Sequence, residues 1–277
     1  MSELIKSTDL RDRLASLPPI RKARFGIHKG LDDVLDGIEA GEIITIAAMP
    51  GSGKTSLCIS MTKDLAKDYK CLWFSCEMGP QAFFNMFGED IPLFYLPEEM
   101  KNFGTTREML AWLEGIIREA KETVGVDVIF LDHLQYLTNL SSDRTTQMVD
   151  FIMRWLKTMV IKYDVTLFLI THIDKDSGKE ERRPSLASMR GSQMIAGESS
   201  TVLIIQRLKE KQVDAWGEHP WSTKSRIYVE KNRRTGNLGH ITMQYDKDAR
   251  IFNDIEELGQ PIAGAPIGPE IDWANKL

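Results

Sequence analysis

The stretch Ala48-Met49-Pro50-Gly51-Ser52-Gly53-Lys54-Thr55 decides the fold that we predict for this chain. It follows an apolar run at residues 43–47 that predicts a buried strand, and a helical pattern runs on to about residue 69. A strand, a glycine-rich loop and a helix in this order are the setting of a phosphate-binding loop. A glycine-rich turn with an ordinary surface lysine is the weaker interpretation, given the flanking elements. We therefore expect a nucleotide-binding protein.

The residue types in this loop each have a chemical reason. Gly51 and Gly53 allow backbone N–H groups to wrap around phosphate oxygens, and the N-terminus of the helix adds partial positive charge. Lys54 is placed to reach the β- and γ-phosphates, and Thr55 to coordinate the Mg²⁺ that bridges them. Ala48 stands where the pattern usually begins with glycine, a departure of one methyl group. The expected nucleotide-binding residues are Pro50, Gly51, Ser52, Gly53, Lys54, Thr55 and Ser56.

Composition and charge exclude several classes of protein. The longest apolar runs are too short to span a bilayer and the N-terminus lacks a secretion-signal profile, so we expect a cytoplasmic protein with no membrane partner. Cys58, Cys71 and Cys76 lack metal-ligand spacing to histidine and predict buried thiols. The net charge of −5 argues against general affinity for nucleic acid, so any basic surface must be local.

Two further apolar segments lead into acidic residues. Residues 71–75 predict a strand followed by Glu77, and residues 126–132 predict a strand that ends in Asp132. Open α/β sheets bind ligands beyond the carboxyl ends of their strands. Glu77 is thus positioned to orient a water against the γ-phosphate. An equally good interpretation is that Glu77 is a structural acid near the start of a helix at residues 80–87. Asp132, combined with Lys54 and Thr55, predicts a second carboxylate of a magnesium site.

The following segments alternate between helical and extended patterns. Helical periodicity covers residues 105–124 and 147–163, and residues 165–170 predict a strand that ends before Thr171 and His172. A lone histidine is more often structural, but at the carboxyl end of a strand this one would sense the γ-phosphate. Strands that alternate with helices behind a phosphate loop predict the α/β class, with a mainly parallel twisted sheet flanked by helices.

Beyond His172 the pattern is less regular. In chain order we expect a polar loop at residues 174–183, a helix at 185–194, a strand at 200–205 and a loop at 207–222. Alternating strands at residues 226–230 and 241–245 around a turn at 234–237 predict a C-terminal β-hairpin. The polar loop contains equal numbers of acidic and basic residues, so by charge alone it is a solvated loop. Its basic residues are Lys175, Lys179, Arg182 and Arg183.

We expect three parts along the chain: an N-terminal helix or arm at residues 1–22, an ATPase domain at 23–255 and an acidic flexible tail at 256–277. Leucines give residues 7–17 one apolar helical face, which either packs on its own domain or docks as an exchanged arm on a neighbouring subunit. Residues 21–38 are expected to form a connection. Trp273 among acids suits docking to a partner, and a solubilising tail that contacts nothing is the equal alternative.

The order of the motifs resembles one family. The motifs lie at residues 48–55, 74–78, 130–134, 170–172 and 190–192, with Lys231-Asn232-Arg233 and Thr235-Gly236 after them. In this order they look like those of the replicative hexameric DNA helicases of the DnaB-like group. The likeness is greatest to the helicase half of bacteriophage primase-helicases and to the mitochondrial Twinkle helicase, and it covers about residues 10–252.

The resemblance implies a RecA-like motor that translocates on single-stranded DNA from 5′ to 3′ and unwinds the duplex as a ring hexamer. ATP, or another NTP or dNTP, is then bound with Mg²⁺ between subunits. Lys54 and Thr55 would hold phosphate and metal, Glu77 would activate the water, and Asp132 would complete the metal site. His172 matches the phosphate sensor of the phage type. A phage-encoded protein in the host cytoplasm is also implied.

The resemblance assigns further residues to a neighbour's nucleotide and to DNA. Arg233 matches the arginine finger, with Lys231 beside it, and Tyr245 falls near the residue that stacks on the base. The loop after His172 matches a DNA-contacting channel loop, which implicates Lys175, Lys179, Arg182 and Arg183. Two positions depart from the family: Gly197 stands where a glutamine is expected, and Asp174 where a relative can have a basic residue.

The implied partners are single-stranded DNA, five further copies of the chain, and a replicative polymerase, a primase or a single-strand-binding protein at the tail. The residues before the first strand are too few for a primase domain, so we expect a stand-alone motor. A RecA- or RadA-like recombinase and a KaiC-like regulatory ATPase are the alternative functions. The Lys-Asn-Arg hairpin favours the helicase.

Overall fold

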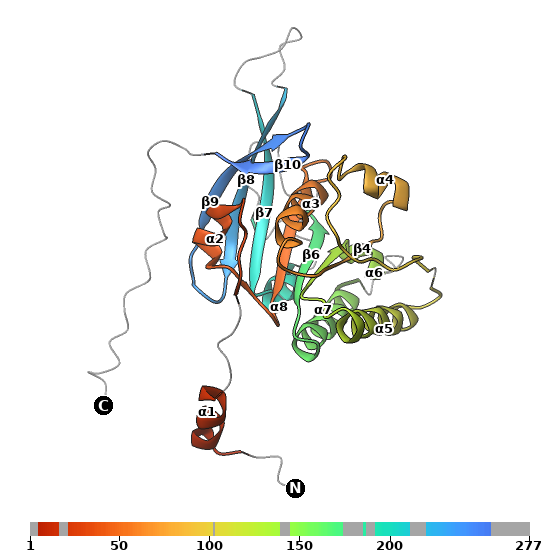
Figure 1. The fold of residues 1–277 in the computed structure, drawn as a ribbon, viewed down its shortest axis with the longest axis vertical. Helices are drawn as coiled ribbons and strands as arrows, with labels where there is room; N and C mark the ends of the chain where they lie inside the picture. The colour runs from red at the N-terminus through yellow and green to blue at the C-terminus, as the bar shows by residue number, and fades with distance from the viewer. Residues whose placement is uncertain are drawn as a thin grey trace, which may run out of the picture.

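The computed structural model describes residues 5–16, 22–101, 103–138, 145–173, 185–186, 192–210 and 220–255. Helices flank one large twisted sheet (Figure 1). The helices are α1 Ser7–Ala15, α2 Lys29–Leu35, α3 Lys54–Leu65, α4 Pro80–Asn85, α5 Thr106–Thr123, α6 Leu134–Thr138, α7 Thr145–Lys162 and α8 Ser192–Glu198. The strands are β1 Lys22–Ala23, β2 Ile38–Glu39, β3 Ile43–Ala48, β4 Cys71–Ser75, β5 Val128–Asp132, β6 Thr166–His172, β7 Thr201–Lys209, β8 Trp221–Asn232, β9 Gly239–Asp246 and β10 Ile251–Asp254.

The main sheet has eight strands in the order β10-β9-β8-β7-β3-β6-β5-β4. Strands β7, β3, β6, β5 and β4 are parallel, and β8, β9 and β10 continue the sheet in antiparallel pairs. Strand β3 is buried at all six positions, which explains its unbroken apolar sequence. The register pairs Ala48 with His172 and Ser75 with Asp132, so the residues after these strands gather at one edge. The predicted α/β class and mainly parallel sheet are confirmed.

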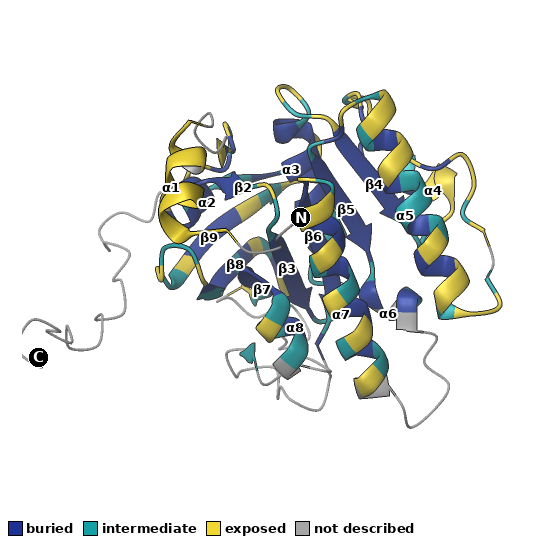
Figure 2. Cartoon of the chain, turned by 90° about the horizontal axis from the view of Figure 1, so that it is seen from below, coloured by how far each residue is buried: buried dark blue, intermediate teal, exposed yellow. Residues whose placement is uncertain are grey.

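Two apolar layers hold the helices against the sheet. On one face α3 contributes Leu57, Met61 and Leu65. On the other face α5 and α7 contribute residues such as Leu113 and Ile152. Figure 2 shows α5 and α7 against the buried strands, with an exposed outer stripe on each of these two helices, whereas no residue of α3 is exposed. Helix α5 begins with a capping box, in which Thr105 and Glu108 bond to each other's backbone N–H groups.

The structure corrects two expected segments. Residues 21–38 form β1, α2 and β2, where we expected a connection. This short helix depends on distant partners, because Asp254 Oδ2 accepts from the Gly30 N–H at 2.7 Å. The expected loop at residues 207–222 is also wrong at both ends: β7 runs to Lys209 and β8 starts at Trp221, and these two residues pair across the ladder. Cross-strand bonding extends both strands beyond the buried core.

Other boundaries differ by less. Helix α4 ends at Asn85 and α3 at Leu65, both earlier than expected, while α6 and β10 are additional. Cys58 and Cys71 are buried as predicted, whereas Cys76 is partly exposed. Every described side chain of α1 is exposed, and its role as an arm stays a prediction. The described residues include no helix that is long and apolar enough to cross a membrane.

Replacing Arg234 by alanine should destabilise the fold by about 2–4 kcal/mol. Its guanidinium donates to the Leu35 and Asp36 carbonyls at 2.8 and 2.9 Å and to the Glu42 carboxylate at 3.2 Å, which ties the β8–β9 turn to α2. Loss of this group leaves several mostly buried acceptors unpaired. Urea unfolding measures the effect. Arg24→Ala is the control, because this exposed side chain also pairs with Asp36 and should cost under about 1 kcal/mol. Equal costs would contradict the assignment.

Candidate active site

The glycine-rich loop between β3 and α3 adopts the backbone that the sequence predicts. Gly51 and Gly53 have φ angles of 75° and 90°, a region that favours glycine. A Cβ on Gly53 would lie 3.3 Å from the Phe252 ring, whereas a Cβ on Gly51 would meet no described atom within 4 Å. Gly53 caps α3 without a side-chain hydrogen bond among the described residues. The open space and the uncapped amides suit a phosphate group.

Lys54, Thr55 and Asp132 lie together at the carboxyl edge of the sheet. Lys54 is buried, its Nζ donates to the Met49 carbonyl at 3.3 Å, and burial lowers its pKa against the opposing effect of Asp132 and Glu77. Thr55 Oγ1 donates to Asp132 Oδ2 at 2.6 Å. Burial raises the pKa of Asp132, and its Oδ1 is buried without a hydrogen-bond partner among the described residues. A hydroxyl and a carboxylate with a spare oxygen are a donor set that Mg²⁺ prefers.

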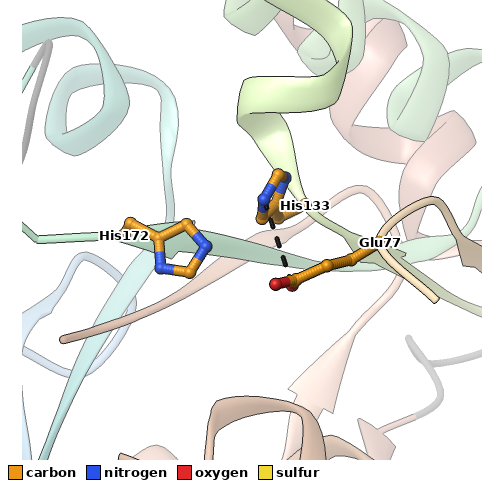
Figure 3. Close-up of side chains that lie close together, drawn as sticks. All are labelled: Glu77, His133 and His172. Atoms are coloured by element: carbon orange, nitrogen blue, oxygen red, sulfur yellow. Dashed lines mark ion pairs between the residues drawn. The ribbon is translucent and has the colours of Figure 1, made fainter. Parts of the chain in front are cut away.

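Glu77, His133 and His172 come from the ends of three neighbouring strands and face one another (Figure 3). Glu77 follows β4 and is half-exposed, and its Oε2 lies 3.9 Å from His133 Nε2. His172 ends β6 and meets the His133 ring edge-on, with ring centroids 4.7 Å apart. Burial, Lys54 and His133 lower the pKa of His172 to about 4, so its imidazole is neutral at physiological pH.

The lowered pKa of His172 predicts a pH effect on stability. In the unfolded chain the imidazole binds a proton below its ordinary pKa of 6.5, whereas the folded protein resists protonation until about pH 4. The unfolded state therefore binds more protons in this window, and stability should fall as the pH drops from 6.5 to 4. His172→Gln should flatten that part of the curve. Chemical unfolding of the nucleotide-free protein at several pH values measures it. Parallel curves for the two proteins would refute the effect.

Tyr245 lies beside the start of α3. Its ring contacts Phe252 at a centroid distance of 5.0 Å, and Phe252 packs against Gly53. Burial raises the pKa of Tyr245, and the positive charge of Arg250 and a hydrogen bond with Ser56 partly oppose this. Phe252 is itself held because its backbone N–H donates to Ser60 Oγ at 2.9 Å. The structure thus places an aromatic ring near the phosphate loop, and the stacking of Tyr245 on the base stays a prediction.

The phosphate loop lies at the carboxyl end of β3. Lys231 and Arg233 lie at the opposite end of the sheet, near the amino end of that strand. The Arg233 N–H donates to the Ser200 carbonyl and the Ser200 N–H to the Ile43 carbonyl, both at 2.8 Å, so Arg233 is level with the amino end of β3. The length of β3 puts about 20 Å between this level and the loop. The Lys231 ammonium donates to the Ala196 and Gly197 carbonyls. Arg233 therefore lies far from its own chain's Lys54.

Several expected residues lie outside the described residues: Lys175, Lys179, Arg182, Arg183, Arg190 and the tail at 256–277. The departure at Gly197 is described, and there the backbone carbonyl accepts from Lys231 and Arg233. His133 is the residue that sequence reasoning missed. It directly follows Asp132 at the end of a strand, which is the same signal that identified His172.

Two family comparisons match more than half of the chain each. Residues 104–254 match the DnaB-like helicase C terminal domain, and residues 26–178 match an AAA domain. The Replicative DNA helicase DnaB of Mycoplasma genitalium is 24% identical over 257 residues, covering 80% of this chain and 54% of that protein. The Replicative DNA helicase DnaC of Bacillus subtilis is 22% identical over 268 residues, covering 86% and 58%. The chain spans about half the length of the curated relatives that it matches.

Solved structures share the fold. A DnaB-like replicative helicase, studied together with its interactions with primase, superposes with a TM-score of 0.69 at 17% identity, over 90% of this chain and 67% of that one. A separately solved ATPase domain superposes with a TM-score of 0.67 at 16% identity, over 90% of this chain and 96% of that one. At these identities the likeness shows that this chain shares the fold of those two proteins.

Proposed function

The chain belongs to the family of DnaB-like helicase C-terminal domains, and on this premise we propose that it is an ATP-driven motor that unwinds duplex DNA. It binds ATP with Mg²⁺, forms a ring of six copies and moves along single-stranded DNA from 5′ to 3′. The observation that carries the proposal is the group of buried Lys54, buried Asp132 and partly buried Thr55 behind a glycine-rich loop. The cytoplasm is the proposed location.

Each residue of the candidate active site has its own role in ATP hydrolysis. The loop amides and Lys54 hold the β- and γ-phosphates, and the Thr55 hydroxyl with the spare Asp132 oxygen would hold Mg²⁺. The metal supplies charge neutralisation of the phosphates. Glu77 accepts a proton from the water whose oxygen attacks the γ-phosphorus, as the bond to the β-phosphate oxygen breaks and ADP leaves. The half-exposed carboxylate of Glu77 is open to this water.

His172 and His133 border the same space. A neutral His172 donates a hydrogen bond to the γ-phosphate without adding charge, and its place at the end of β6 joins the nucleotide to the segment that follows. That segment contains the proposed DNA contacts Lys175, Lys179, Arg182 and Arg183. Loss of the γ-phosphate would thus change the position of the segment that contacts DNA. Tyr245 stacks on the base, on the side of α3 away from this cluster.

Arg233 and Lys231 act on the nucleotide of a neighbouring copy. Their position at the far edge of the sheet excludes their own chain's phosphate loop, which supports an assembly in which each site lies between subunits. A hexamer satisfies this requirement by closing the ring. Primase is a proposed partner, because a fold neighbour was studied with primase. A polymerase or a single-strand-binding protein at the tail is a further proposed partner.

The alternative functions receive less support. The family match extends through residues 104–254, which includes the β8–β9 hairpin with Lys231 and Arg233. A RecA-like recombinase or a KaiC-like ATPase would share the phosphate loop, but this family match favours the helicase. We therefore retain one proposed function.

A forked DNA with one labelled strand tests the proposal. The protein should release the labelled strand with ATP and Mg²⁺, and should fail without either. Lys54→Ala should fail to unwind, whereas Arg118→Ala on the exposed surface of α5 should unwind normally. ATP hydrolysis without strand release, or pairing of homologous strands in place of separation, would contradict the helicase function.

A further inference from the structure

We propose that Glu77, His133 and His172 form a binding site for one transition-metal dication, with Zn²⁺ as the best fit, and that the bound ion blocks ATP turnover. The inhibitory half of this inference rests on the proposed function, whereas the binding half stands on geometry alone. The three residues form a compact group of metal-competent side chains in the described part of the chain (Figure 3).

The geometry needs little adjustment to hold an ion. Each residue offers one ligand atom, and these atoms all lie within 4.8 Å of one another, with 3.9 Å between Glu77 Oε2 and His133 Nε2. Ligand bonds of about 2.0–2.2 Å in a tetrahedral zinc site put ligand atoms roughly 3.4 Å apart. Rotation of the half-exposed Glu77 side chain closes the difference. The two histidines sit at the ends of the neighbouring strands β5 and β6, which hold them in place.

The donor types select the metal. Two imidazoles and one carboxylate suit Zn²⁺ and neighbouring transition metals, whereas Mg²⁺ prefers oxygen ligands alone. The oxygen-only pair of Thr55 and Asp132 lies nearby and suits Mg²⁺. Nδ1 of His133 and Nδ1 of His172 are both buried without a hydrogen-bond partner among the described residues. These two Nδ1 atoms therefore have no hydrogen bond to a described residue that metal binding would have to break.

Local charge permits a dication. The carboxylates of Glu77 and Asp132 and the ammonium of Lys54 act on one another electrostatically. One net negative charge remains at neutral pH, so a bound dication leaves the group at one net positive charge. Repulsion from Lys54 opposes binding, but two carboxylates outweigh it.

Inhibition follows from the identity of the ligands. A carboxylate that is bound to a metal ion is a far weaker base, so Glu77 could not take the proton from the attacking water. His172 would also lose its free ring nitrogen to the ion. A single ion thus removes two of the groups that ATP hydrolysis uses, while the Thr55 and Asp132 pair remains able to hold Mg²⁺.

Isothermal titration of the nucleotide-free protein with Zn²⁺ alone tests the binding half. We expect one ion per chain, with His133→Asn and Glu77→Gln each weakening affinity at least about tenfold. Glu77→Gln guards against a folding defect, because this side chain is half-exposed. His240→Asn, an exposed histidine on β9, and Cys76→Ser, the nearest thiol in sequence, should bind as the wild type does. Unchanged affinity in both ligand variants, or loss in Cys76→Ser, would overturn the site.

Steady-state ATP hydrolysis tests the inhibitory half. With Mg²⁺ in excess, equimolar Zn²⁺ should lower the wild-type rate at least about tenfold, and a chelator should restore it. Inhibition is expressed relative to each variant's own metal-free rate, and His133→Asn should require more Zn²⁺ than His240→Asn. Binding without inhibition would refute this half. No hydrolysis in the absence of Zn²⁺ would instead refute the proposed function and leave the calorimetric result standing.

Discussion

Glu77→Gln is expected to slow ATP hydrolysis by roughly 10²- to 10⁴-fold while ATP binding stays near the wild-type level. The amide keeps the shape of the carboxylate but cannot accept the proton of the attacking water. Lys54→Ala should abolish hydrolysis and also weaken binding, because the buried ammonium is proposed to contact the phosphates themselves. Steady-state hydrolysis and equilibrium binding of a labelled ATP analogue, measured side by side, separate the two effects.

Glu122→Gln is the matched control for this prediction. Glu122 is an exposed acid near the end of α5, on a different part of the surface, and its replacement should leave both binding and hydrolysis unchanged. The catalytic assignment is wrong if Glu77→Gln hydrolyses ATP at the wild-type rate. Weakened binding in Glu77→Gln would instead indicate that the carboxylate supports the loop after β4.

Arg233→Ala should lower ATP turnover on the order of 10³-fold, with ATP binding by the chain's own loop preserved. A guanidinium stabilises the negative charge that grows on the transferred phosphoryl group, and only the transition state benefits fully. The side chain is exposed and lies at the amino edge of the sheet, so its removal should not disturb the phosphate loop. Hydrolysis rates measured together with urea unfolding separate catalysis from folding.

Arg118→Ala on α5 is a control of the same residue type, and it should hydrolyse ATP normally. Arg233→Lys should recover little activity, since a lysine presents a point charge in place of a planar fork of donors. Near-normal turnover by Arg233→Ala would remove this residue from the site.

Local patterns sufficed to predict most of the parallel half of the sheet. Strand β3 is buried on both faces, so its sequence is uninterrupted and easy to recognise, and the loop after it has a strong signature. The segments that we misjudged depend on contacts far along the chain. Strand β10 begins just before the acidic tail and is held by Ser60, while α2 is held by Arg234 and Asp254. No short-range pattern carries such information.

The same distinction applies to the site. Lys54, Asp132 and His172 could be placed together from the rule that ligands bind beyond the carboxyl ends of parallel strands, and the register brings them to one edge. The proximity of His133 to Glu77 could not be predicted, because it depends on how two side chains turn after neighbouring strands. The catalytic roles of all these site residues stay predictions, as do the DNA contacts on the loop after His172.

The central claim is that each ATP site combines the phosphate loop of one chain with Arg233 of another. A mixture of Lys54→Ala and Arg233→Ala chains tests it most directly, since each variant alone is inactive for a different reason. ATP hydrolysis should reappear in the mixture and peak near equal amounts, where intact loops most often meet intact fingers. A mixture that stays as inactive as its components at every ratio, although the chains co-assemble, would contradict the claim.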